Sequence, residues 1–181
     1  MNIATLFFGE RIRLGAFRPD DSLTFERWYQ DTAFSRHLDS SPAIPKSAAR
    51  LSRWLEDEER NRDSYIFAVR TLDLDTLIGF VQLDGIMWNH RSSWLAIAIG
   101  EPGYRGRGYG DEAMRLLLQF AFHEINLHRL QLTVFAYNAP AIHLYEKLGF
   151  VREGVFREAL LRDGHRYDML LYGLLAREWK R

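Results

Sequence analysis

The 181-residue chain is 47% hydrophobic and 27% charged, the balance of one globular domain, which we expect to span residues 1–181. Its formal net charge is zero and its pI is about 7.0, so we expect no nucleic acid or membrane partner. The absence of cysteine excludes disulfides, thiolate metal ligands and a cysteine nucleophile. Neither a targeting segment nor a membrane-length apolar run is recognisable, and we expect a soluble cytoplasmic protein.

The first half of the chain predicts two helices and four strands. A short helix is expected over residues 23–30, and Ser47 is a suitable cap for a second one. Residues 35–45, with two prolines, are expected to be irregular. Alternating or short apolar runs predict strands over residues 11–17, 65–70, 77–87 and 94–100.

The second half predicts two more helices and three more strands. Apolar residues recur at helical spacing up to Ile125, and a further helix is expected between a capping Asn138 and Gly149. Strands are expected over residues 129–137, 151–161 and 166–175. The order predicts an α/β fold with a mixed, mostly antiparallel sheet of about seven strands flanked by about four helices. Residues 94–100 and 129–137 should pair in parallel through a right-handed crossover.

A glycine-rich loop, Arg105–Gly110, separates the strand at 94–100 from the next helix. Glycines allow the backbone to approach a ligand closely, and the start of a helix offers unpaired N–H groups, so this loop is suited to a diphosphate. A Walker A loop requires Gly-Lys-Ser/Thr, and a dinucleotide fingerprint requires G-x-G-x-x-G. Neither pattern is present, although a nucleotide-binding protein and a purely structural turn both remain alternatives at this stage.

Two motifs together resemble the acetyl-CoA site of the GNAT superfamily of N-acetyltransferases. The first is the Arg-x-x-Gly-x-Gly pattern of Arg105–Gly110, and the second runs from Asn138 to Phe150. The resemblance covers most of the chain from about Leu77 onward. The hairpin at 83–94 and the segment 153–168 are similar to the branch that holds ribosomal-protein-alanine and polyamine N-acetyltransferases.

The resemblance implies the single-domain GNAT fold, with a parallel central strand pair splayed at a bulge. It also implies direct acetyl transfer from acetyl-CoA to a primary amine, without a covalent enzyme intermediate. The amine is a protein N-terminus, a polyamine or a small amine metabolite. No metal is implied. The residues expected to bind acetyl-CoA are Ala98, Ile99, Gly100, Arg105, Gly106, Arg107, Gly108, Tyr109, Gly110 and Asn138.

The resemblance implies that Tyr145 is the general acid that protonates the leaving sulfur, while helical spacing also allows a packing role. The base is open, because Leu95 occupies the position where relatives often have glutamate. Asp84 and His90 are candidate bases, and each also reads as a structural or solvated residue. A water relay would need neither of them.

Three further expectations concern the alternative function, the oligomeric state and the amine site. A non-catalytic acyl-CoA sensor of the same fold is the alternative to an enzyme, and Leu95 gives it some support. A homodimer, formed through the last strands or the helices, is expected of this branch. The amine should enter opposite coenzyme A, beside the early helices and the final hairpin.

Overall fold

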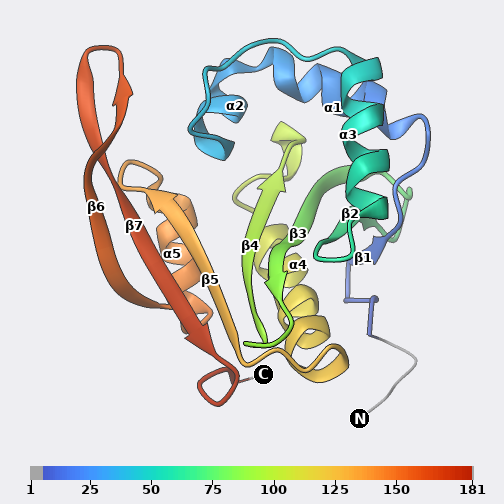
Figure 1. Ribbon diagram of the computed structural model, residues 1–181. Helices are drawn as coiled ribbons and strands as arrows, with labels where there is room; N and C mark the ends of the chain where they lie inside the picture. Colours follow the sequence, from blue (N-terminus) through green and yellow to red (C-terminus); the bar gives the residue numbers. More distant parts are fainter. Residues whose placement is uncertain (1–5, 181) are drawn as a thin grey trace.

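The computed structural model describes residues 6–180, which contain one seven-stranded sheet of order β1-β2-β3-β4-β5-β7-β6 (Figure 1). The strands are β1 (Ile12–Gly15), β2 (Tyr65–Thr71), β3 (Leu77–Met87), β4 (Ser92–Ile99), β5 (Arg129–Phe135), β6 (Val151–Arg162) and β7 (His165–Leu175). The helices are α1 (Asp21–Gln30), α2 (Thr32–Leu38), α3 (Ala48–Arg60), α4 (Tyr109–Gln119) and α5 (Ala139–Lys147). A 3₁₀ turn, η2 (Pro102–Tyr104), precedes α4, and a π turn, η3 (Phe120–Glu124), follows it.

The seven strands confirm the sequence prediction, whereas α2 was not predicted, and its residues 35–38 fall in the segment expected to be irregular. Asp31 caps α2 by accepting a hydrogen bond from the Ala33 N–H at 2.9 Å. Its seven residues are too few to give a clear helical periodicity, and only Phe34 and Ser35 are buried. The structure therefore has one more helix than the four expected, and the irregular segment shrinks to the chain between α2 and α3.

The parallel pair β4–β5 is joined only at its first three residue pairs, Ser92–Arg129 to Trp94–Gln131. Beyond Trp94 the two strands separate, and Figure 1 shows them meeting at their lower ends and diverging upward. The other edge of β4 stays paired with β3 as far as Ile99. A register shift in that β3–β4 pair, between Asp84 and Met87, lies opposite the joined end of β4. The expected splayed pair is thus confirmed.

Helices cover both faces of the sheet, and each face has its own core. Met114 and Leu117 of α4 pack with Val81 and Leu83 of β3 in the main core, which α5 also covers. The other face carries an aromatic core beneath α1 and α3, made by Phe25, Trp28, Tyr29, Phe34, Leu51, Phe80 and Ala98. Because successive strand residues point to opposite faces, β3 and β4 contribute side chains to both cores.

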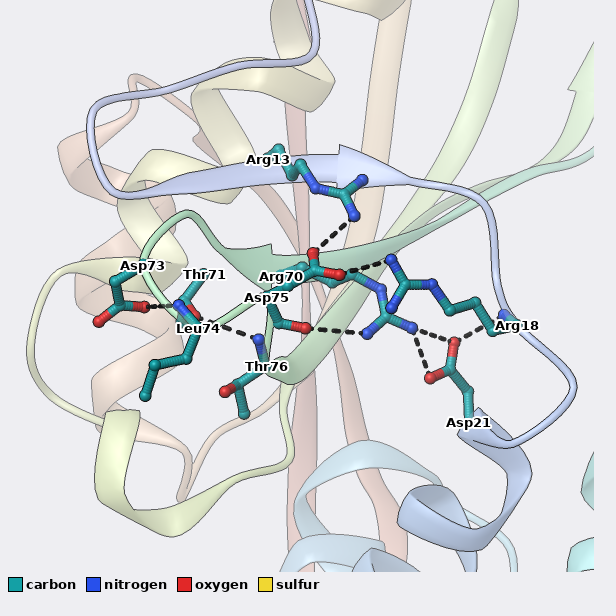
Figure 2. Close-up of polar contacts among 9 residues, drawn as sticks. All are labelled: Arg13, Arg18, Asp21, Arg70, Thr71, Asp73, Leu74, Asp75 and Thr76. Atoms are coloured by element: carbon teal, nitrogen blue, oxygen red, sulfur yellow. Dashed lines mark hydrogen bonds and ion pairs between the residues drawn. The ribbon is translucent and has the colours of Figure 1, made fainter.

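Ion pairs attach the beginning of α1 to the sheet (Figure 2). Asp21 accepts two hydrogen bonds of 2.5 Å from Nη2 of Arg70 in β2, and both side chains are buried. Beside them, Asp75 pairs with Arg18 at 2.5 Å and with Arg13 at 2.6 Å. Hydrogen bonds from Arg18 and Arg13 lower the pKa of the Asp75 carboxyl. This network holds the beginning of α1 against the sheet, and the rest of α1 contributes Phe25, Trp28 and Tyr29 to the aromatic core.

Candidate active site

The outer end of β4 is a strand edge without a partner strand. No strand within residues 6–180 pairs with β4 beyond Trp94 on the β5 side, so every second residue there turns its N–H and C=O into the gap. An extended ligand can pair with such an edge as an added strand does. A Cβ atom at Gly100 would lie 2.1 Å from the Trp28 ring, so only glycine allows the indole to lie against the end of this edge.

The glycine loop connects this edge to the first turn of α4. Gly106 has φ +70° and Gly108, the N-cap of α4, has φ +85°, which are conformations that favour glycine. No side chain caps α4, so the first N–H groups of the helix are free to bind an anion. An added Cβ at Gly110 would be 3.7 Å from Ile97 and from Leu144, which places the start of α4 against β4 and α5.

The Arg105 side chain turns back onto β4 instead of pointing outward. Its Nε donates to the Ile99 carbonyl at 2.9 Å, and Nη2 donates to the Gly100 carbonyl at 2.7 Å. Nη1 also lies 3.6 Å from the Asp31 carboxylate. Arg105 therefore anchors the loop to the strand end, while Arg107 remains exposed and forms no ion pair with residues 6–180.

Arg11 is a loop contact that sequence reasoning missed. Its guanidinium lies 4.4 Å from the centroid of the Tyr109 ring, and Nη1 donates to the Arg107 carbonyl at 3.0 Å. Nε pairs with Glu112 of α4, also at 3.0 Å. The residue lies almost a hundred positions before the loop, and no local pattern in the sequence connects the two.

Asn138 and Tyr145 lie at the beginning and near the end of α5. The Asn138 side chain caps the helix by accepting a hydrogen bond from the Ala141 N–H at 3.4 Å. The Tyr145 ring is 6% exposed and packs edge-on against Phe150, with ring centroids 5.8 Å apart. Its hydroxyl has no hydrogen-bond partner within residues 6–180, yet it is not among the fully enclosed polar atoms. Burial raises the pKa of Tyr145 above its ordinary value, so the hydroxyl stays protonated.

The two candidate bases occupy different places. Asp84 is exposed, accepts from the Gly85 N–H at 2.8 Å and lies two positions after Gln82 on the same face of β3. His90 is exposed in the β3–β4 turn, at the joined end of the β4–β5 pair. The length of β4, roughly 23 Å, separates this turn from the glycine loop. Leu95 is buried in the main core, on the α4 face of the sheet.

A cavity of about 260 Å³ lies on the opposite face of β4 from α4. We call it the acceptor cavity. It is bounded by α1, α2, α3, the chain between α2 and α3, and the middle of β3 and β4, and its lining residues are Tyr29, Leu38, Asp39, Lys46, Arg50, Leu51, Trp54, Phe80, Gln82 and Ala96. Because Ala96 belongs to the part of β4 without a β5 partner, the cavity adjoins the free strand edge.

The described residues contain neither a metal-ligand cluster nor a membrane-spanning helix. Within residues 6–180, no cluster of three or more His, Cys, Asp or Glu side chains is arranged to hold a metal ion. None of the helices in this range combines the length and the apolar character needed to cross a membrane.

Comparison with known proteins identifies relatives of the whole chain. A family model described as an acetyltransferase (GNAT) domain matches residues 11–151. The chain is 30% identical over 176 residues to the SPbeta prophage-derived uncharacterized N-acetyltransferase YokL of Bacillus subtilis (strain 168), covering 97% of this chain and 96% of the relative. It is 38% identical over 93 residues to the spermidine N(1)-acetyltransferase of Vibrio cholerae, covering 51% of this chain and 53% of the relative.

A solved structure matches the fold closely. The crystal structure of spermidine N-acetyltransferase from Vibrio cholerae in complex with CoA and spermine aligns with a TM-score of 0.85 and 25% identity, covering 94% of this chain and 98% of the other. The splayed β4–β5 pair, the glycine loop at α4 and the family match over residues 11–151 agree with one another. The protein therefore belongs to the GNAT family of N-acetyltransferases.

Proposed function

We propose that this protein transfers an acetyl group from acetyl-CoA directly to a primary amine. The observation that carries the proposal is the free edge of β4, which leads into an uncapped helix start and adjoins the acceptor cavity. Leu144 of α5, next to the buried Tyr145, lies against the start of α4. These features support a site that binds an extended phosphate-bearing ligand on one side and an amine on the other.

Acetyl-CoA would bind from the α4 side of the sheet. Backbone N–H groups of Arg105–Gly110 would hold the pyrophosphate at the start of α4. The pantetheine arm would follow the free edge at Ala98–Gly100 as an added strand, and the Asn138 amide would hydrogen-bond the arm. The Ile99 N–H would donate to the thioester oxygen, where negative charge develops during the reaction.

The chemical step would be a direct displacement. The neutral amine attacks the thioester carbon, the carbon–sulfur bond breaks, and the leaving thiolate accepts a hydrogen bond from Tyr145 or takes its proton, which Tyr145 then regains from solvent. The amine loses one proton, which passes to solvent directly or through a base. No bond to the protein forms at any stage, which agrees with the absence of cysteine.

Of the two candidate bases, Asp84 lies nearer the acceptor cavity, because it shares a face of β3 with Gln82. Its partner in the β3–β4 register is Trp94, five residues or roughly 17 Å along β4 from Ile99, so Asp84 would have to take the amine proton through water. If Asp84 accepts the amine proton, Asp84→Asn lowers kcat/KM at neutral pH by roughly a hundredfold, a usual size for loss of a base. His90→Asn is the matched variant, and we expect it to leave kcat/KM within about twofold. Equal kcat/KM values for Asp84→Asn and the unmodified protein would leave proton removal to water.

Thiol release from acetyl-CoA tests the function directly. Purified protein is incubated with acetyl-CoA and a panel of amines that contains polyamines, amino acids and peptides with free N-termini. Amine-dependent release of CoA, with acetylated amine detected by mass spectrometry, is the expected result. Tight binding of acetyl-CoA with no transfer to any amine would favour the non-catalytic acyl-CoA sensor.

We also propose that two copies associate through β6. This strand forms one edge of the sheet, and Val151, Phe156 and Leu161 on it are each at least half exposed. An exposed apolar edge strand is a ready partner for a second chain. Light scattering should give twice the chain mass, and Phe156→Ser should shift the protein to a monomer. A monomeric unmodified protein would contradict this proposal.

A further inference from the structure

The charges around the acceptor cavity favour a particular class of acceptor. Two cationic side chains, Lys46 and Arg50, and one carboxylate, Asp39, line the cavity. Neither cation has a carboxylate within ion-pair distance among residues 6–180. The Asp39 carboxylate accepts a hydrogen bond from the Ser41 N–H at 2.9 Å. The cavity lining therefore carries two positive charges and one negative charge, an excess of one positive charge.

The Lys46 ammonium is held inside the cavity by an aromatic ring. Its Nζ lies 3.9 Å from the centroid of the Tyr29 ring, a cation–π contact. Burial lowers the pKa of Lys46, and the nearby Arg50 charge lowers it further, while Asp39 acts in the opposite direction. An anion between Lys46 and Arg50 would relieve the repulsion between the two cations.

Gln82 offers the cavity a neutral acceptor. Its side-chain nitrogen donates to Glu58 at 2.9 Å and to Ser64 at 3.2 Å. The amide oxygen has no partner within residues 6–180 and is not fully enclosed. Gln82 and Ala96 are partners in the β3–β4 register, and both line the cavity, so the Gln82 side chain belongs to the part of the cavity that adjoins β4. A substrate N–H group can donate to the Gln82 oxygen there.

We propose that the acceptor is a small amine that also carries an anionic group such as a carboxylate. The anion binds between Lys46 and Arg50, and the amine extends past Gln82 and Ala96 along the edge of β4 toward Ile99. This inference rests on the proposed acetyl transfer. A polyamine brings only positive charge and would be repelled by both cations. A cavity of about 260 Å³ is also at the small end for ligand sites, which suits a molecule the size of an amino acid.

Matched acceptors test the inference. Each standard amino acid is compared with the amine that its decarboxylation leaves, for example lysine with cadaverine, and phosphoethanolamine is compared with ethanolamine. Spermidine and a short peptide amide with a free N-terminus complete the panel. We expect at least one member with an anionic group to have a kcat/KM about tenfold or more above that of its counterpart without this group and above that of spermidine. A higher kcat/KM for amino acids identifies a carboxylate as the bound group, and a higher kcat/KM for phosphoethanolamine identifies a phosphate.

Two variants connect the preference to the cavity. Arg50→Gln and Lys46→Gln should each raise KM for the best anionic acceptor about tenfold, the usual loss for one hydrogen bond to a charged group, with kcat within about twofold. Neither variant should weaken the use of the decarboxylated counterpart. Arg53→Gln is the matched control, because Arg53 lies on the same helix, outside the cavity, and is exposed.

The possible failures are distinct. If spermidine, cadaverine or the peptide has the highest kcat/KM, the inferred acceptor class is wrong while acetyl transfer stands. If Arg50→Gln and Lys46→Gln lower the use of acceptors with and without the anionic group equally, the cations do not bind the anion and the inference also fails. If no amine in the panel is acetylated, the proposed function fails together with the inference.

Discussion

Replacing Tyr145 with phenylalanine removes one hydroxyl from the proposed site and leaves the ring in place. The ring is 6% exposed and packs against Phe150, and phenylalanine keeps this contact. Because the hydroxyl has no partner within residues 6–180, its removal should leave the free energy of unfolding unchanged or slightly higher. Any loss of activity is then a loss of chemistry and not of folding.

The size of the loss follows from the pKa of Tyr145. Burial raises this pKa above 10.0, whereas a thiol has a pKa of about 8.5, so complete proton transfer from the phenol to the thiolate is unfavourable. The hydroxyl should act mainly as a hydrogen-bond donor to the sulfur. A hydrogen bond to a charged group is worth about 1.5–3 kcal/mol, which corresponds to a fall in kcat of roughly 10- to 150-fold.

Steady-state thiol release and urea denaturation measure both quantities on the same preparation. Tyr172→Phe is the matched control, because the Tyr172 hydroxyl is satisfied by Glu146 at 2.8 Å and lies outside the proposed site. It should lose stability, by about 1.5–3 kcal/mol, and keep kcat within about twofold. A Tyr145→Phe protein with kcat within threefold of the unmodified protein would refute the role given to this hydroxyl.

Three further predictions concern stability and the glycine loop. Burial, with a contribution from Asp39, raises the pKa of Tyr29 to about 12. The stability that the neutral Tyr29 side chain contributes is therefore fully present below pH 10 and is lost as the pH rises towards 12. The loss is roughly 2–3 kcal/mol in denaturation curves, and Tyr29→Phe should remove it. Arg70→Met leaves the Asp21 carboxylate buried without its ion-pair partner, and should lower the free energy of unfolding by about 3–5 kcal/mol, measured by calorimetry. The double variant Arg70→Met, Asp21→Leu should recover most of this stability. Equal losses in the single and double variants would contradict the account. Arg11→Gln should weaken acetyl-CoA binding about three- to tenfold in calorimetric titration while changing stability by less than about 1 kcal/mol, and unchanged binding would mean that Arg11 does not support the loop.

Local patterns predicted the fold well because its strands are long and clearly bounded. Alternation and turn residues placed β2, β3 and β7 within one residue of their observed bounds at each end. The glycine loop was also predicted correctly as a turn, because the left-handed backbone at Gly106 and Gly108 favours glycine. What was missed has no local signal, because α2 is seven residues long and its stability depends on packing by Phe34.

The acceptor side of the candidate site was predicted only in outline: the early helices border the cavity, whereas no residue of the final hairpin lines it. The loop and the α5 motif lie in consecutive segments, and the resemblance drew attention to both. The acceptor cavity combines Tyr29, Lys46 and Gln82 from three distant segments, and the sequence gives no reason to group them. Arg11 and Arg105 illustrate the same limit, since contact with a backbone carbonyl leaves no trace in residue spacing. The sequence therefore shows that arginines lie near the glycine loop, but it does not show which carbonyl or carboxylate groups each guanidinium contacts.

Calorimetric titration with acetyl-CoA, beside ATP and NAD, tests the central claim most directly. The account predicts saturable binding of acetyl-CoA alone, one molecule per chain, weakened at least about tenfold by Gly108→Asp, which combines left-handed strain with a negative charge at the phosphate site. Gly103→Asp is the matched control and should leave binding unchanged. Gly103 lies in the η2 turn, a Cβ there meets no atom within 4 Å, and its φ is outside the left-handed region. Folded protein that does not bind acetyl-CoA, or that binds ATP or NAD equally well, would contradict the account.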